Sequence, residues 1–194
     1  MVDSFFARMR LLGFTAFFFK RTRCCRSWPG FRPRIELLES RCVPATLIVD
    51  TAFDEVDPSD GRLSLREAVF AAGAGDVIHF APVLASNIQL NSGLGIFTPL
   101  TIDGEPLPNS SPTVTVDFSF SASLAPGFVL TGGGATIRGL DIRNVTGAAI
   151  EIDSDDNSVR NCRVSQTSVN SQGVGHAVLV LASNNTIENN TIEN

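Results

Sequence analysis

Apolar and polar residues alternate in short segments that recur along the second half of the chain. Three ten-residue segments, 135–144, 157–166 and 185–194, carry aliphatic residues at the same two places. Alternation with a period of two is typical of a strand with one buried face. The segments begin 22 and then 28 residues apart, which indicates a solenoid of stacked units. The sequence therefore predicts an all-β, parallel β-helix, with its clearest repeats over residues 127–194. Three columns of side chains are expected in its interior: Leu130, Ile152 and Val180; Ile137, Val159 and Ile187; Ile142, Val164 and Ile192.

A single residue divides each segment into two strands. Gly139, Asn161 and Asn189 occupy this place, and Gly and Asn are the residues that best tolerate a left-handed backbone. We expect a structural bend at these residues, where the chain turns a corner of the coil. The stacked amides of Asn161 and Asn189 are also expected to hydrogen-bond along the solenoid axis as a structural ladder.

One loop contains the irregularity of the repeat. All six additional residues of the longer unit lie in the segment 165–175, and insertions in solenoids often lie on a binding face. This region carries neutral hydrogen-bonding groups but no carboxylate or basic side chain other than a histidine. Such groups suit a sugar ligand, or simply a solvated loop, because loops lengthen at little entropic cost. The candidate ligand residues are Gln166, Asn170, Gln172 and His176.

A short helix is predicted before the first coils. The apolar residues of the segment 64–73 recur at helical spacing. Ser64 and Glu67 form a capping box, in which each side chain accepts a backbone N–H of the first turn, and Gly73 is typical of a helix end. We expect this helix to cover the apolar end of the first coil.

The charge of the chain is divided between two parts. Residues 1–46 hold nine Lys and Arg against three acids, whereas residues 47–194 hold six Arg against seventeen acids. We expect residues 1–46 to be a basic, poorly structured targeting segment and residues 47–194 to be the β-helix. A net charge of −11 on the second part argues against a nucleic-acid partner. The apolar segment 5–19 is shorter than the roughly 18 to 20 residues that a membrane span requires, and two arginines interrupt it.

Two segments resemble those of known secreted proteins. The segment Arg32–Ala45 (RPRIELLESRCVPA) is similar to the RPRLE-type export motif that precedes the mature region of many large bacterial proteins. The alternative for this motif is a short amphipathic helix over residues 35–41. The segment LSLREAV resembles the CSLREAI segment of predicted secreted β-helix proteins, with Leu63 in place of the cysteine. The resemblance implies a right-handed, pectate-lyase-like β-helix and a secreted or cell-surface location.

The outward charged side chains form few recognisable arrangements. Asp141 and Arg163 occupy the same place in successive coils, about 4.8 Å apart, and are therefore expected to pair with each other. They make up the candidate charged face, and no catalytic residue is identified. The fourth cysteine, Cys162, is expected to be a small buried side chain and not a reactive thiol.

No metal site or cofactor is expected from the sequence. The cluster Asp153, Asp155, Asp156 and Asn157 begins like a calcium loop, but Ser158 replaces the glycine that the loop requires, and Val164 its final glutamate. A solvated turn is the favoured interpretation, so calcium stays possible but unsupported. His79 and His176 lack the spacing of a zinc site.

Two classes of function are compatible with these features. The first is a secreted or cell-surface β-helix with a structural, adhesive or glycan-binding role, whose partner is a polysaccharide or surface glycan. The alternative is a polysaccharide lyase or glycoside hydrolase that acts on acidic polysaccharides, since many enzymes that resemble this fold do so. The last segment of the chain has no cap, which predicts either end-to-end association or continuation in a longer chain.

Overall fold

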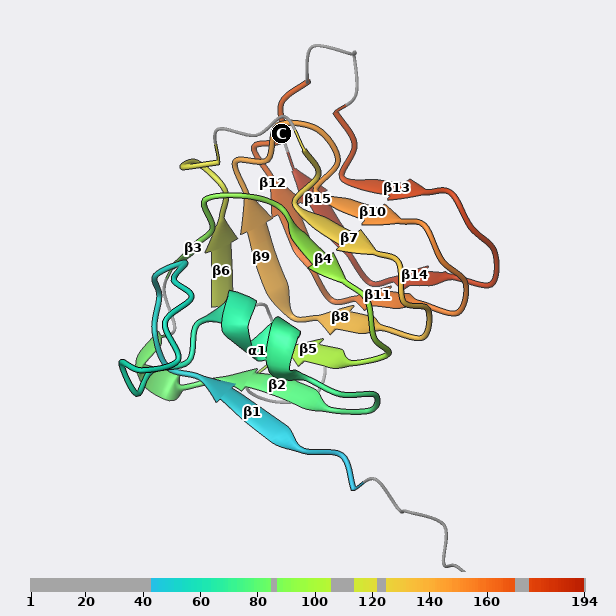
Figure 1. The fold of residues 1–194 in the computed structure, drawn as a ribbon. Helices are drawn as coiled ribbons and strands as arrows, with labels where there is room; N and C mark the ends of the chain where they lie inside the picture. The colour runs from blue at the N-terminus through green and yellow to red at the C-terminus, as the bar shows by residue number, and fades with distance from the viewer. Residues whose placement is uncertain (1–42, 85–86, 106–113, 122–124, 170–174, 194) are drawn as a thin grey trace, which may run out of the picture. The chain divides into compact units, whose positions relative to one another are not determined.

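The strands of the chain form three parallel sheets that wind around one core. The computed structural model describes residues 43–84, 87–105, 114–121, 125–169 and 175–193. Within them, neighbouring strands of each sheet come from successive turns of the chain (Figure 1). The clearest coils pass once through each sheet. This arrangement is a parallel β-helix, as the repeat predicts.

The described residues contain fifteen strands, one α-helix and one 3-10 turn. Sheet 1 contains β1 (Thr46–Val49), β2 (Val77–Phe80), β5 (Thr101–Asp103), β8 (Thr136–Arg138), β11 (Ser158–Arg160) and β14 (Thr186–Glu188). Sheet 2 contains β4 (Leu94–Ile96), β7 (Phe128–Leu130), β10 (Ile150–Ile152) and β13 (Val178–Val180). Sheet 3 contains β3 (Ile88–Gln89), β6 (Val114–Asp117), β9 (Leu140–Arg143), β12 (Arg163–Ser165) and β15 (Thr191–Glu193). The helix is α1 (Leu65–Ala71) and the 3-10 turn is η1 (Pro82–Leu84).

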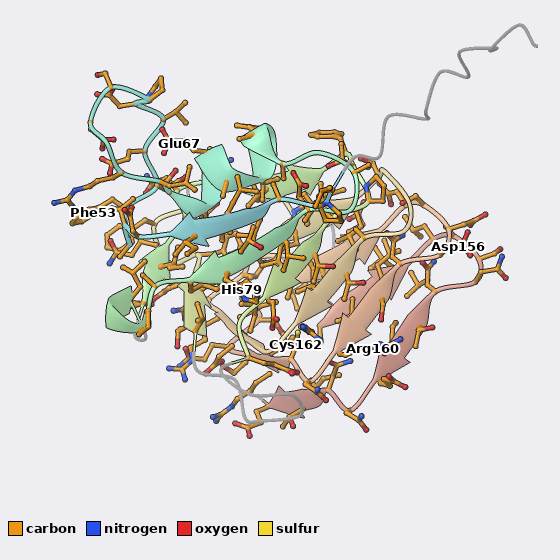
Figure 2. The ribbon with its side chains drawn as sticks, turned by 90° about the horizontal axis from the view of Figure 1, so that it is seen from below. Phe53, Glu67, His79, Asp156, Arg160 and Cys162 are labelled. Carbon is orange, nitrogen blue, oxygen red and sulfur yellow. The ribbon has the colours of Figure 1, made fainter. Side chains whose placement is uncertain are left out.

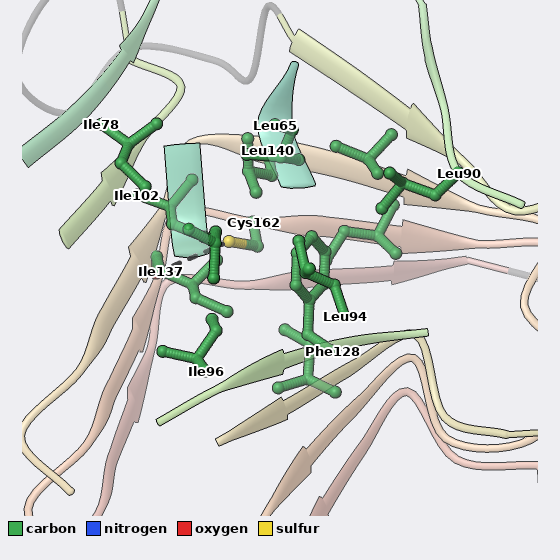
Figure 3. Packing of buried hydrophobic residues seen from close by; sticks show 14 of the residues in the cluster. Leu65, Ile78, Leu90, Leu94, Ile96, Ile102, Phe128, Ile137, Leu140 and Cys162 are labelled. Atoms are coloured by element: carbon green, nitrogen blue, oxygen red, sulfur yellow. Dashed lines mark hydrogen bonds between the residues drawn. The ribbon is translucent and has the colours of Figure 1, made fainter. Parts of the chain in front are cut away.

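The register of the strands confirms the three predicted columns. In sheet 1, Val159 is the partner of both Ile137 and Ile187. The corresponding columns in sheets 2 and 3 are aligned in the same way. In the coils before the last one these side chains are fully buried, and they pack with the residues of the earlier coils in one hydrophobic cluster (Figure 3).

Helix α1 packs against β1 at the N-terminal end of this core (Figure 1). The predicted capping box is present: the Ser64 hydroxyl accepts the Glu67 N–H at 3.2 Å, and the Glu67 carboxylate accepts the Ser64 N–H at 2.9 Å. The apolar face of the helix is buried in the core. The helix ends before residue 73 because Ala72 already has an extended backbone, with ψ of 132°.

The corner between sheet 1 and sheet 3 is a left-handed residue in three successive coils. The φ angles of Gly139, Asn161 and Asn189 are +66°, +51° and +55°. At Gly139 a side chain would also collide with Glu105 and the backbone of Gly104. The corner therefore needs a residue that tolerates this backbone, and in the first of these coils it needs the absence of a side chain.

The amide ladder lies at a different corner from the one that the sequence predicts. Asn161 donates its side-chain amide to Glu105 at 2.6 Å and not to Asn189, because Glu105 packs against the space that Gly139 leaves. The ladder forms instead one residue before the strands of sheet 1. The Asn157 side-chain oxygen accepts the Ala135 N–H at 2.9 Å, and the Asn157 N–H donates to the Asn185 side-chain oxygen at 2.8 Å.

The same contact occurs in the first described coil with a carboxylate in place of the amide. The Ala45 N–H donates to the Asp76 carboxylate at 2.7 Å, one residue before β1 and β2 respectively. In each case the side chain of one coil accepts the backbone N–H of the coil before it. The ladder position thus links successive coils at three places among the described residues, and Asn157 is 1% exposed there.

Burial in the core columns decreases in the last described coil. Ile137 and Val159 are 0% exposed, whereas Ile187, at the same place in β14, is 44% exposed. The apolar contribution of a side chain scales with the area it removes from water. The stability that one aliphatic side chain contributes should therefore differ along a single column.

Two matched substitutions test this difference. Ile137→Ala should lower the free energy of unfolding by about 2 to 5 kcal/mol, the usual cost of truncating a buried Ile. Ile187→Ala makes the same chemical change and should cost about 1 kcal/mol or less, because much of its side chain is already in water. Urea unfolding followed by circular dichroism measures both losses. Equal losses for the two variants would contradict the described packing of this column.

Candidate functional site

Two features that the sequence singles out meet on the outer face of sheet 3. Arg163 is the first residue of β12, and Gln166 follows the end of this strand with a left-handed backbone, φ +55°. Both side chains line a pocket of about 220 Å³ together with Arg143, Ser165 and Glu193. We call this set of five residues the sheet-3 pocket.

The strand register explains why these residues gather. Arg143, Ser165 and Glu193 end three successive strands of sheet 3 and are aligned as partners. Each is separated by one residue from a neighbour on the same face, so the side chains project from the sheet side by side. Three of the five pocket residues therefore occupy equivalent positions of three coils.

The ion pairs of this face differ from the predicted one. Asp141 and Arg163 are aligned in the backbone, but the carboxylate of Asp141 pairs with Arg143 and the guanidinium of Arg163 pairs with Glu193. The predicted pairing between Asp141 and Arg163 was wrong. Residues i and i+2 of a strand share a face, so Arg143 reaches Asp141 along its own strand, and Arg163 is long enough to reach the next coil.

The pair of Asp141 and Arg143 forms the buried side of this charged group. Asp141 is 5% exposed, and the hydrogen bond to its carboxylate is the main cause that raises the pKa of Arg143. Two atoms of the pair, Asp141 Oδ1 and Arg143 Nε, are buried without a hydrogen-bond partner among the described residues. The pair thus holds its charges firmly but does not use all of its hydrogen-bonding capacity.

The other candidate ligand residues do not join the pocket. His176 is exposed, and its backbone carbonyl accepts the Ala149 N–H at 2.8 Å, but its side chain does not line the pocket. Asn170 and Gln172 lie outside the described residues. Of the four predicted ligand residues, Gln166 alone is placed beside the charged face by the described part of the chain.

The acidic segment after β10 contributes to the links between coils. The Asp155 carboxylate accepts the Ser183 N–H of the next coil at 2.7 Å, and the side chain of Asn157 is engaged in the ladder. Among the residues that the structure describes, no group of three or more His, Cys, Asp or Glu side chains is arranged to hold a metal ion.

One cluster on sheet 1 was missed by the sequence analysis. The Asp103 carboxylate lies 2.6 Å from Arg138 Nη2 and 3.6 Å from Nδ1 of His79, which is labelled in Figure 2. Asp103 is 5% exposed beneath these two side chains. The sequence feature that could have revealed this cluster is the similarity of the triplet TID at 101–103 to the triplet TIR at 136–138. The loops of the first coils vary in length, so the repeat did not align these triplets.

Cys162 lies in the core, as its position in the repeat predicts (Figure 3). It is 1% exposed, and burial raises the pKa of its thiol to about 11. Desolvation disfavours the thiolate, which is the reactive form of cysteine. The thiol is therefore a packing group in the folded protein.

Comparison with known proteins supports the fold. Residues 114–194 match a family model described as a right handed beta helix region. The match begins at β6 and covers the coils whose repeats are clearest in the sequence. No curated protein and no solved structure matches the chain. The described helices are all too short or too polar to cross a membrane.

The environment of Cys162 predicts its reactivity. In a variant with serine at the other three cysteines, 24, 25 and 42, Cys162 should react very slowly with a thiol reagent at pH 8, because only about one thiol in a thousand is ionised three units below its pKa. Addition of urea should restore fast labelling as the protein unfolds. Mass spectrometry of the labelled protein measures both rates, and fast labelling without urea would contradict the burial of this residue.

Proposed function

We propose that the protein is a secreted or cell-surface β-helix that binds a neutral glycan at the sheet-3 pocket, without cleaving it. The balance of charges in and beneath this pocket supports the proposal. Two arginines are each paired with one carboxylate, Arg143 with Asp141 and Arg163 with Glu193. The site therefore offers donors and acceptors in similar number and little net charge.

Sugar hydroxyl groups match such a lining. A hydroxyl both donates and accepts a hydrogen bond, so it can bridge a guanidinium and a carboxylate without breaking their ion pair. Ser165 and Gln166 add a hydroxyl and an amide, which serve as further donors and acceptors. A charged ligand would instead compete with one partner of each existing pair, and that competition costs part of its binding energy.

The charge of the whole β-helix favours a neutral ligand over an acidic one. Residues 47–194 carry six Arg and seventeen acids, so the body repels polyanions at long range. This argument weighs against the alternative of a lyase or hydrolase for acidic polysaccharides. The ion pairs of the site support the same conclusion, because both arginines are already paired with carboxylates.

The size of the pocket limits what it holds. Its volume of about 220 Å³ lies below the roughly 300 to 1,000 Å³ of pockets that enclose drug-sized ligands. We therefore propose that it holds one sugar unit, such as a chain end or a branch. Few contacts are made to one unit, so the affinity of a single site should be weak, with a Kd on the order of 1 mM.

Substitutions in the pocket test the proposed binding. Arg163→Ala and Gln166→Ala should each weaken the binding of neutral oligosaccharides by about tenfold, equivalent to 1.4 kcal/mol, because each removes hydrogen bonds to the ligand. Arg62→Ala makes the matched change at an exposed arginine outside the pocket and should leave binding unchanged. NMR titration of the isotope-labelled protein measures the affinities.

Two results of this experiment would count against the proposal. Equal binding by Arg163→Ala, Gln166→Ala and the unchanged protein would show that the pocket is not the site. Release of unsaturated ends from a uronate polymer, abolished by Arg163→Ala, would identify a lyase instead. Digestion with and without calcium, followed by ultraviolet absorbance, measures that release.

The proposed location is supported by the resemblance of the segment Arg32–Ala45 to a bacterial export motif. Expressed in a bacterial host that exports proteins of this type, the chain should appear in the medium or at the cell surface. Replacement of Arg32 and Arg34 by alanine should retain it inside the cell. Cell fractionation and immunoblotting measure the distribution, and retention of the unchanged chain in the cytoplasm would count against export.

A further inference from the structure

A hollow with mostly apolar walls lies between helix α1 and the loop that precedes it. Its volume is about 450 Å³, within the range of roughly 300 to 1,000 Å³ that is typical of ligand pockets. Arg62 and Glu67 contribute to its lining. We call it the cap hollow, and it shares no residue with the sheet-3 pocket. The rest of its lining is apolar: Val56, Pro58, Leu63, Phe70 and Ala71.

Hydrogen bonds between the loop and the helix hold the walls of the cap hollow in place. The loop, residues 50–64, lies beside α1 (Figures 1 and 2). Glu67 Oε1 of the helix accepts the Asp57 N–H at 2.7 Å. The Ser64 hydroxyl, just before the helix, donates to the Glu55 carbonyl at 2.6 Å. A ligand therefore meets walls that are already ordered, and little entropy is lost on this side of the contact.

An ion pair anchors the same loop to the first coils. The guanidinium of Arg66 donates to both carboxylate oxygens of Asp54, at 2.6 and 2.9 Å. The Asp54 carboxylate also accepts the Asn91 N–H at 2.8 Å. The charge of Arg66 is thus balanced by Asp54 and does not contribute to the potential at the hollow.

The remaining charges of this region are mostly negative. The segment 54–67 supplies five of the seven lining residues, and it holds five acids and two arginines. With Arg66 paired to Asp54, Arg62 is the one arginine of this segment that remains. Four carboxylates stand against it: Glu55, Asp57, Asp60 and Glu67.

Two of these carboxylates belong to the hollow or its immediate edge. Glu67 lines the hollow, and Asp57 lies in the chain between two lining residues. A hydrogen bond from the Ser64 N–H is the main cause that lowers the pKa of Glu67, and one from the Ser59 hydroxyl lowers the pKa of Asp57. Both groups are therefore ionised at neutral pH, and this edge favours a positive charge over a negative one.

The walls of the cap hollow stay largely in contact with solvent. Val56 is 64% exposed and Phe70 is 60% exposed, although both line the hollow. A small-molecule pocket usually encloses roughly 70 to 90% of the surface of its ligand. An open hollow instead suits one side chain of a larger partner. Aromatic and arginine side chains, such as Phe70 and Arg62, are also enriched in protein interfaces.

We propose that the cap hollow binds a peptide segment of a partner protein, which inserts a bulky apolar side chain and places a basic side chain at the carboxylate edge. The apolar group covers walls that otherwise face water, and this contribution scales with the apolar area removed from water. The basic group is attracted by Asp57 and Glu67, which discriminate against acidic segments. The net charge of residues 47–194, six Arg against seventeen acids, attracts such a partner at long range. The proposal does not depend on glycan binding at the sheet-3 pocket.

Matched peptides test both parts of this recognition. A blocked tetrapeptide with Phe and Arg at its centre should bind to the full chain. Replacement of its Phe by Ala should weaken binding at least about tenfold, because the apolar contact is lost. Replacement of its Arg by Glu should weaken binding by a similar factor, because attraction becomes repulsion. NMR titration of the isotope-labelled protein measures the affinities.

Variants of the protein locate the site. Phe70→Ser removes an apolar wall and Ala71→Trp fills the space, so each should weaken binding of the Phe-Arg peptide at least about tenfold. Asp57→Asn keeps an oxygen that can accept from Ser59 and should weaken binding by about two- to fivefold, through the lost charge. Phe120→Ser is the matched control, because Phe120 is as exposed as Phe70 but lies outside the hollow. Urea unfolding shows that each variant keeps its fold.

Several results would overturn the proposal. It fails if no peptide binds, if the three peptides bind equally, or if Phe70→Ser and Ala71→Trp bind the Phe-Arg peptide as well as the unchanged protein does. Tighter binding of the Glu-containing peptide would make Arg62 the recognition group instead. Decylammonium carries an apolar chain and a positive charge without a peptide. If it binds more tightly than the Phe-Arg peptide, the hollow is a small-molecule site.

Discussion

The register between coils is the constraint on which the rest of this structure depends. Parallel hydrogen bonds hold each residue over its equivalent in the next coil, about 4.8 Å away. The aliphatic columns of the core, the left-handed corners and the outward rows are all consequences of that one alignment. A shift of one residue in any strand would turn its core side chain outward and its polar neighbours inward. The core and the surface are therefore specified by the same hydrogen bonds.

Much of the fold could be predicted from the sequence because the register is visible as a repeat. The period of two located the core column of Ile137, Val159 and Ile187, and the residue type at Gly139 indicated a left-handed corner. The capping box of α1 was equally readable, because its hydrogen bonds join residues three apart in the chain. Local patterns and regular repeats indicate strand register and helix ends, and both can be recognised in a sequence without knowledge of the fold.

Side-chain contacts were less predictable, because register places Cα atoms and not the ends of long side chains. Asp141 and Arg163 are aligned in the backbone, yet Asp141 pairs with Arg143 and Arg163 pairs with Glu193. In each pair the long arginine side chain reaches a carboxylate away from the aligned position. Glu105 captures the amide of Asn161 across 56 residues of sequence, from a coil whose loops hide its alignment. The cluster of Asp103, Arg138 and His79 was missed for the same reason. Long polar side chains choose among several neighbours, and the choice depends on packing that no single segment encodes.

The ladder at Ala45, Ala135 and Asn157 has a direction. In each link the accepting side chain belongs to the later coil and the N–H that it satisfies belongs to the earlier one. Harm from a substitution at Asn157 therefore falls on the preceding coil, where the buried Ala135 N–H loses its acceptor, while the hydrogen bond from the Asn157 N–H to Asn185 in the following coil is kept. Successive coils have the same backbone path, but each ladder contact makes the earlier coil depend on a side chain of the later one. If one coil is duplicated within such a chain, the copy brings with it the side chain that accepts the backbone N–H of the coil before it.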